Sequence, residues 1–183
     1  MINTDKPFEL RMYFFVPYNI SPVQHGIQAG HCVEEYSDKY FSTALYQDYR
    51  THKTWIILNG GTTNKRRDLD GISLGSLNQI GDSLLENGID FSYFEEPDLN
   101  DALTAVCFIC DERVWNYEDY PNLNEYVFDS LMFPNPELRI KIAMMSEDEI
   151  KINYYIVYLE WIESMGGKKN IFLRELIKGK KKA

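Results

Sequence analysis

The chain has 183 residues, 44% of them hydrophobic, and a formal net charge of −9 at pH 7. This composition suits one folded domain with an appended segment and excludes a disordered polar chain. No apolar run approaches the roughly 18 residues of a membrane span, and three cysteines without an export signal are expected to be reduced thiols in a cytoplasm.

Apolar runs and turn residues predict alternating strands and helices up to Asp111. The predicted order is strand 10–16, helix 22–41, strand 54–59, a helix from Leu74 to a stop at Gly88, strand 89–94 and strand 102–110. The polar stretch 60–73 is interpreted as a long loop. This order is typical of an α/β fold with helices packed on a small sheet.

Residues 112–183 form a predicted helical extension to a domain over 1–111, with one candidate strand around 113–117. Two short helices are separated by prolines 134 and 136, and SEDE (146–149) is a capping box that begins a longer helix. One stripe of that helix is apolar: Ile150, Tyr154, Val157, Tyr158, Trp161 and Met165. Gly166–Gly167 ends it, and Asn170 is expected to cap a last helix through Ile177.

The charge is uneven along the chain. The segment from Met165 onward contains seven Lys/Arg residues and one acid, Glu175. Its net charge is therefore +6, which leaves −15 for residues 1–164. An acidic body is a poor general binder of nucleic-acid phosphates. The basic tail is interpreted as a solvated terminus, with a phosphate backbone or an acidic partner as the alternative.

SPVQHGIQAGH (21–31) begins the first helix, with Ser21 as N-cap, Pro22 at the first position and Gln24 completing a capping box. A rotation of about 100° per residue separates a packing side from a polar line. The predicted packing side is Val23, Gly26, Ile27, Ala29, Gly30, Val33, Tyr36 and Tyr40. The polar line is Gln24, Gln28, His31 and Glu35. Each helical glycine costs about 1 kcal/mol, which predicts a close approach of this helix to the sheet.

The polar line has two interpretations, a solvent-facing stripe and the wall of a ligand site. The turn from a first strand into a first helix lies at the carboxyl edge of the sheet, where ligands usually bind in open α/β folds. The N-terminus of a helix also favours anions. The second interpretation therefore makes this line a candidate site.

The Q-x-x-H of Gln28 and His31, within this order of elements, resembles the archaeal and eukaryotic type of peptidyl-tRNA hydrolase. It is closer still to small bacterial and phage-encoded relatives with an S-P-x-Q-x-x-x-Q-A-G-H helix start. EPDLNDALTA (96–105) is similar to their E-P-D-L…L-T-A before the last strand. The resemblance covers roughly residues 10–111. It implies a four-stranded mixed sheet with helices on both faces, and hydrolysis of the ester that joins a peptide to the terminal ribose of tRNA.

Carried over residue by residue, Gln28 matches the family glutamine, His31 its following histidine and Thr104 the threonine that opens the last strand. Gln28 and Thr104 would orient the substrate, and His31 would support the wall. The family acid, which would position water, is carried over to one of three residues in the preceding bend: Glu95, Glu96 and Asp98.

Gln24 stands where the family has a lysine, and the family has basic residues near Pro22 and Val23. A glutamine offers a hydrogen bond but no charge for phosphate or for a leaving oxygen. His25 lies about 100° from Gln24 on the helical wheel, so it replaces the lysine only in part. Gln24 stays a candidate site residue, and the expectation of activity is weakened.

Other motifs predict no cofactor and no metal site. CFIC (107–110) lies on a predicted strand, where positions three apart face opposite sides, so Cys107 and Cys110 are interpreted as buried small hydrophobes. The three histidines have no close partner in sequence. Gly60–Gly61 and the basic trio 65–67 lack the order of a phosphate loop.

Two functional hypotheses follow. The first is a cytoplasmic peptidyl-tRNA-hydrolase-like esterase that acts on the 3′ end of tRNA. The alternative is a catalytically silent relative that binds a protein or a nucleotide, such as a phage-encoded accessory factor in the host cytoplasm. Neither hypothesis involves a membrane, and both leave the oligomeric state open, a dimer included.

Overall fold

The computed structural model describes residues 7–63, 75–131 and 135–183. The predicted basic trio 65–67, the start of the second helix at Leu74 and Pro134 lie outside the described residues. The chain divides into two compact units. One unit, here the α/β unit, comprises Pro7–Glu112 with Ile177–Ala183. The other, the helical unit, comprises Arg113–Leu176.

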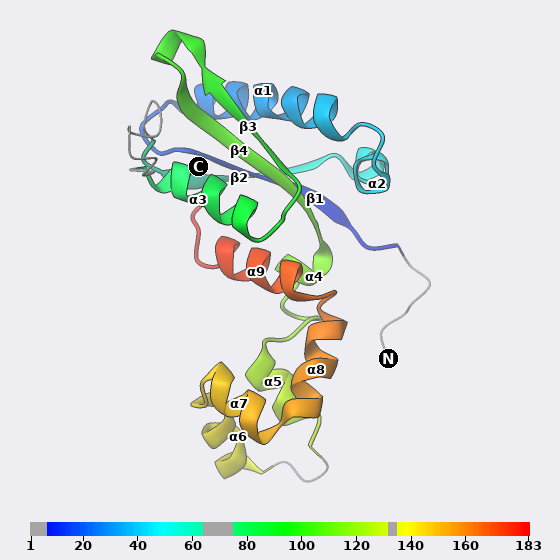
Figure 1. The fold of residues 1–183 in the computed structure, drawn as a ribbon. Coiled ribbons are helices and arrows are strands. Elements are labelled where there is room, and N and C mark those ends of the chain that lie inside the picture. Colours follow the sequence, from blue (N-terminus) through cyan, green and yellow to red (C-terminus); the bar gives the residue numbers. More distant parts are fainter. Residues whose placement is uncertain (1–6, 64–74, 132–134) are drawn as a thin grey trace. The chain divides into compact units, whose positions relative to one another are not determined.

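A four-stranded mixed sheet forms the α/β unit (Figure 1). Its strands are β1 (Leu10–Pro17), β2 (Thr54–Gly61), β3 (Phe91–Glu96) and β4 (Ala102–Asp111). The order across the sheet is β2-β1-β4-β3, with β1 parallel to β2 and β4 antiparallel to both of its neighbours. The α/β fold and the mixed sheet are confirmed, and each strand bound lies within two residues of the predicted one.

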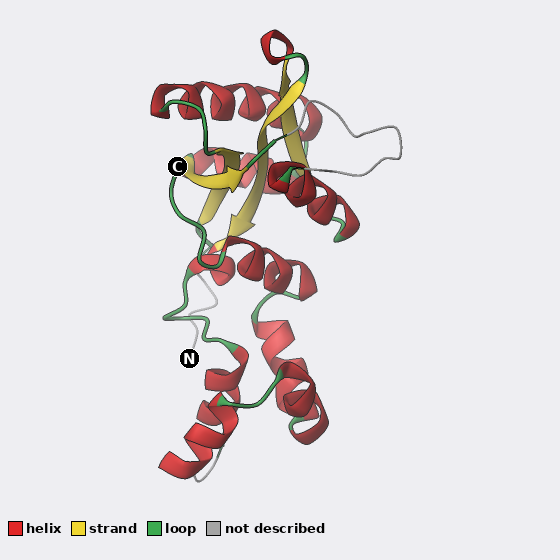
Figure 2. Ribbon diagram, turned by 90° about the vertical axis from the view of Figure 1, so that its left-hand side faces the viewer, coloured by secondary structure: helices red, strands yellow, loops and turns green. Residues whose placement is uncertain are grey.

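Helices cover both faces of this sheet (Figure 1; Figure 2). On one face α1 (Pro22–Tyr40) and α2 (Ala44–His52) share a core with the β1 side chains of Met12 and Phe14. On the other face α3 (Ser76–Glu86) packs its Leu77 so tightly beside Gly60 and Phe15 that a Cβ on this glycine would lie 2.7 Å from the leucine. The sequence had not indicated α2, which Thr43 caps.

The face of α1 that meets the sheet differs from the predicted one. Its buried residues are His25, Gln28, Ala29, Cys32 and Tyr36, whereas Val23 and Ile27 are 73% and 49% exposed. The predicted close approach through glycines is wrong, because a Cβ on Gly26 or Gly30 would meet nothing within 4 Å. Two polar side chains, His25 and Gln28, take the places that apolar ones were expected to fill.

Short helices make up most of the described chain from Glu112 onward. They are α4 (Glu112–Trp115), α5 (Leu123–Asp129), α6 (Pro136–Ala143), α7 (Glu147–Asn153), α8 (Tyr155–Ser164) and α9 (Lys168–Ile177). The candidate strand at 113–117 is therefore wrong, since α4 lies there. The core of the unit consists of Tyr120, Leu123, Val127, Ile142, Ile150, Trp161 and Met165.

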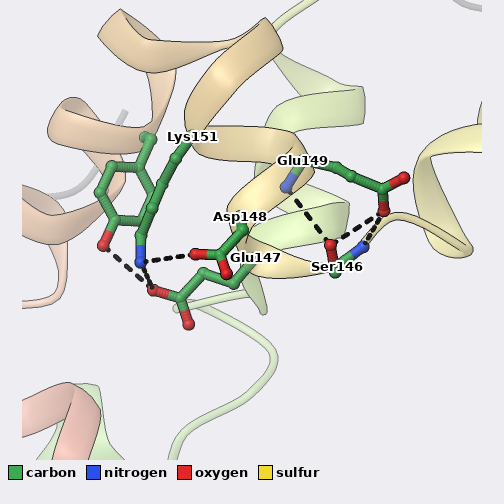
Figure 3. Close-up of polar contacts among 6 residues, drawn as sticks. Ser146, Glu147, Asp148, Glu149 and Lys151 are labelled. Carbon is green, nitrogen blue, oxygen red and sulfur yellow. Dashed lines mark hydrogen bonds and ion pairs between the residues drawn. The ribbon is translucent and has the colours of Figure 1, made fainter.

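The capping box of SEDE is confirmed at the start of α7 (Figure 3). Ser146 Oγ accepts from Glu149 N–H, and Glu149 accepts from Ser146 N–H at 2.7 Å. The long helix predicted after it is broken at Tyr154, whose φ of −136° and ψ of 41° lie outside the helical region. Asn170 lies inside α9 and donates to Met165 O instead of capping the helix.

The basic tail is not a free terminus. Lys182 forms an antiparallel bridge with Leu58 of β2, Asn59 N–H donates to Lys181 O at 2.9 Å, and Ala183 N–H donates to Ile57 O at 3.1 Å. The lysine side chains are exposed, as expected, but the backbone covers the β2 edge of the sheet. None of the helices in the described ranges is long and apolar enough to cross a bilayer.

Candidate functional site

Gln28 is the centre of a polar cluster that joins α1 to two strands. Its Nε2 donates to Glu96 Oε2 on β3 at 2.7 Å, and its Oε1 accepts from Thr104 Oγ1 on β4 at 2.5 Å. These contacts span 68 and 76 residues of sequence. The structure therefore brings together the glutamine, the threonine and one acid of the predicted site.

The orientation of the Gln28 amide follows from its two partners. A carboxylate only accepts, so Nε2 must face Glu96, and the opposite orientation would place two oxygens together. Thr104 has one hydroxyl proton, which goes to Gln28 because the alternative acceptor, Phe94 O, is farther away at 3.3 Å. Gln28 is 7% and Thr104 1% exposed, so both depend on these bonds. The clamped amide keeps a second Nε2 hydrogen for another acceptor.

The acid of this cluster is Glu96, and the predicted roles of Glu95 and Asp98 are not supported by contacts. Glu96 is half-buried, whereas Glu95 and Asp98 are exposed. Side chains alternate along a strand, so Phe94 and Glu96 face α1 and Glu95 does not. Asp98 lies beyond β3 in a short 3-10 turn, Pro97–Leu99.

Gln24 does not join the cluster. Its Oε1 accepts from Ser21 N–H at 3.0 Å and its backbone N–H donates to Ser21 Oγ at 3.3 Å. The predicted capping box is confirmed, and it holds the side chain at the exposed helix start. Glu35 is also exposed, so the predicted polar line is not one continuous wall.

His31 lies beside the cluster in an aromatic stack. Its ring centroid is 4.6 Å from that of Phe94, and the two planes make an angle of 21°. His31 is exposed and Phe94 is half-buried, so the phenyl ring supports one face of the imidazole. His31 thus contacts β3 two residues before Glu96.

His25 lies on the buried face of α1, although the sequence did not assign it to the packing side. It is 8% exposed, and its Nε2 lies 3.0 Å from Pro17 O at the end of β1. A carbonyl only accepts, so Nε2 carries the proton. The buried Nδ1 has no hydrogen-bond partner among the described residues. The spacing of three from Gln28 was the available signal, because residues three apart share a helix face.

Charge at the cluster is negative. No lysine or arginine of the described ranges is hydrogen-bonded or ion-paired to Gln28, Glu96 or Thr104. Among the same residues, no group of three or more His, Cys, Asp or Glu side chains is arranged to hold a metal ion. The described side chains of the cluster offer hydrogen bonding by an amide and proton transfer to a carboxylate.

The cysteines behind the cluster are core residues. Cys32 and Cys107 are buried, and Cys107 Sγ lies 3.4 Å from Cys32 O. Burial raises the pKa of the Cys107 thiol well above its ordinary value, and the neighbouring Cys32 raises it further. Burial also raises the pKa of Cys110. The interpretation of CFIC as buried small hydrophobes is confirmed, and protonated thiols are poor nucleophiles.

Comparisons with known proteins add no family. No protein-family model matches the chain, and no curated protein matches it in sequence.

Proposed function

We propose that the chain is a cytoplasmic esterase that hydrolyses the bond between a peptide and the terminal ribose of tRNA, as the resemblance to peptidyl-tRNA hydrolases implies. The observation that carries the proposal is the Gln28 amide, fixed between Glu96 and Thr104. A preorganised N–H donor beside a carboxylate is what ester hydrolysis by water requires.

The proposed reaction uses these three residues in separate roles. Glu96 accepts a proton from a water molecule while the water oxygen bonds to the ester carbonyl carbon. The second Nε2 hydrogen of Gln28 donates to the oxyanion that forms, and Thr104 keeps the amide in this orientation. The bond to the ribose oxygen then breaks, and the proton held by Glu96 passes to that oxygen. The products are the peptide acid and a free ribose hydroxyl.

The test uses an N-acetylaminoacyl-tRNA in place of a peptidyl-tRNA and measures release of its acyl group, the N-acetylamino acid, by the purified chain. Loss of one oxyanion donor lowers kcat by about 100- to 1,000-fold in other enzymes. We therefore expect Gln28→Met to lower kcat by a factor in this range. Gln79→Met, at an exposed position of α3, is the matched control and is expected to retain the wild-type rate. A wild-type chain that releases peptide no faster than buffer would remove the esterase.

One observation favours the alternative, a silent relative that binds a nucleotide or a protein. The family lysine is replaced by Gln24, which its capping bonds hold at the exposed helix start. Such a protein would bind the acceptor end of tRNA without releasing peptide. Filter binding of peptidyl-tRNA, measured beside the release assay, separates a binder from an enzyme. A phage origin and a dimer are compatible with either function.

A further inference from the structure

The His31–Phe94 stack is an aromatic surface with one open side. Phe94 covers one face of the imidazole at a centroid distance of 4.6 Å. His31 itself is exposed, so its other face meets solvent. The orientation of the exposed ring is thereby fixed before any ligand arrives.

This surface lies directly beside the Gln28–Glu96 bond. His31 follows Gln28 by three residues on α1, which is a rise of about 4.5 Å on one helix face. Phe94 precedes Glu96 by two residues on β3, which is about 6.7 Å along one face of the strand. A ligand that touches the Gln28 amide therefore reaches the outer face of His31 within the length of one nucleoside.

The charge around the stack selects an uncharged aromatic ligand. Glu96 is bonded to the cluster, Glu34 and Glu35 are exposed on the same helix, and no described cation is bonded to the cluster. These carboxylates disfavour a phosphate at this position. A nucleobase is flat and uncharged, and protein sites for unpaired bases commonly stack them on aromatic rings such as histidine.

We infer that the outer face of His31, supported by Phe94, is the stacking site for the terminal adenine of the tRNA substrate. The inference rests on the proposed function, because it takes the ester-bearing ribose to lie at Gln28. It assigns His31 a role in binding the substrate, which is more than supporting the wall of the site.

The experiment measures adenosine binding to the full chain by isothermal titration calorimetry, with D-ribose as the probe that lacks a base. Stacking of one base contributes about 1–3 kcal/mol, so His31→Ala is expected to raise the Kd for adenosine between about fivefold and about 150-fold. His31→Trp keeps an aromatic face and is expected to restore binding. His52→Ala, at an exposed histidine of α2, is the control and leaves the Kd unchanged.

Two results would overturn the inference: wild-type chain that does not bind adenosine, and His31→Ala that binds it as tightly as wild type. The proposed function is judged separately. If adenosine binding depends on His31 but no peptide is released, the stacking site stands and the esterase fails. If peptide is released but His31→Ala leaves the Kd for adenosine unchanged, the esterase stands and the stacking site fails.

Discussion

Replacement of Thr104 by valine tests whether the buried cluster is held together by hydrogen bonds. The change keeps the shape of the side chain and removes the hydroxyl that lies 2.5 Å from Gln28 Oε1. Thr104 is 1% and Gln28 7% exposed, so water does not replace the lost donor freely. A buried acceptor left without a partner costs about 1–3 kcal/mol, and we expect Thr104→Val to lower the free energy of unfolding by that amount.

The coupling between the two side chains is the sharper quantity. Gln28→Met removes the acceptor, and the Thr104 hydroxyl proton can then turn to Phe94 O, which lies 3.3 Å from Oγ1. With both replaced, no unpaired group remains between them, so the double variant is expected to lose less than the sum of the single losses. Residues that share a hydrogen bond typically couple by about 0.5–3 kcal/mol.

Native-state hydrogen exchange at the β4 amides of Val106 and Cys107 measures these free energies. These amides lie in the α/β unit, the unit that contains Thr104 and Gln28. Thr51→Val, at an exposed position of α2, is the control and is expected to change stability by less than about 0.5 kcal/mol. Additive losses from the two single variants would refute the bond between Thr104 and Gln28.

Three further predictions concern stability. Gly26→Ala is expected to raise the free energy of unfolding by about 0.5–1 kcal/mol, because alanine favours the helix and its Cβ meets no atom within 4 Å; a lower urea midpoint would contradict this. Arg174→Met is expected to destabilise the helical unit by about 3 kcal/mol or more in urea unfolding. The Arg174 side chain is 1% exposed, and its guanidinium donates to Tyr120 O at 2.6 Å and to Arg113 O at 2.9 Å, so methionine would leave both oxygens without this donor. Arg139→Met, at an exposed position of α6, is the control and should change stability little. Burial raises the pKa of Tyr49 from 10.0 to about 12. Stability present below pH 10 is therefore lost as the pH rises toward 12, and the melting temperature of Tyr49→Phe should fall less than that of wild type over this range.

Hydrophobic patterning predicted the four strands and two of the helices of the α/β unit, because each of these elements contains enough apolar residues to be recognised from its own sequence. The apolar runs of β1 and β4 are buried nearly throughout, so their position was evident without any knowledge of partners. The helix α2 was missed because only two of its nine residues, Tyr46 and Tyr49, are buried, and its other side chains are mostly polar.

The orientation of α1 was not predictable from hydrophobicity. The helical spacing of apolar residues predicts that Val23 and Ile27 pack against the sheet. In the structure both are exposed, and His25 and Gln28 are buried instead. Buried polar side chains are tolerated only where distant residues supply hydrogen bonds, and here Pro17, Glu96 and Thr104 supply them. The sequence contains these partners but does not show that they meet.

The identity of the acid also required the structure. The bend after β3 offers several carboxylates, and the pairing of β3 with β4 shifts register between Phe94 and Glu95. The shift leaves Thr104 of β4 without a partner on β3, while Phe94 and Glu96 stay two residues apart on β3 and both face α1. Which acid meets Gln28 therefore depends on a pairing between distant segments, and the sequence alone does not show that pairing.

The most direct test of the central claim compares two adjacent acids in single-turnover hydrolysis of N-acetylaminoacyl-tRNA. Glu96→Gln keeps the size of the side chain and removes the proton acceptor beside Gln28. Glu95→Gln makes the same change on an exposed side chain outside the cluster. The predicted result is a loss of at least about 100-fold for Glu96→Gln, in line with the usual contribution of a general base, and a rate within about twofold of wild type for Glu95→Gln. Equal rates for the two variants would contradict the assignment of the site to Gln28, Glu96 and Thr104.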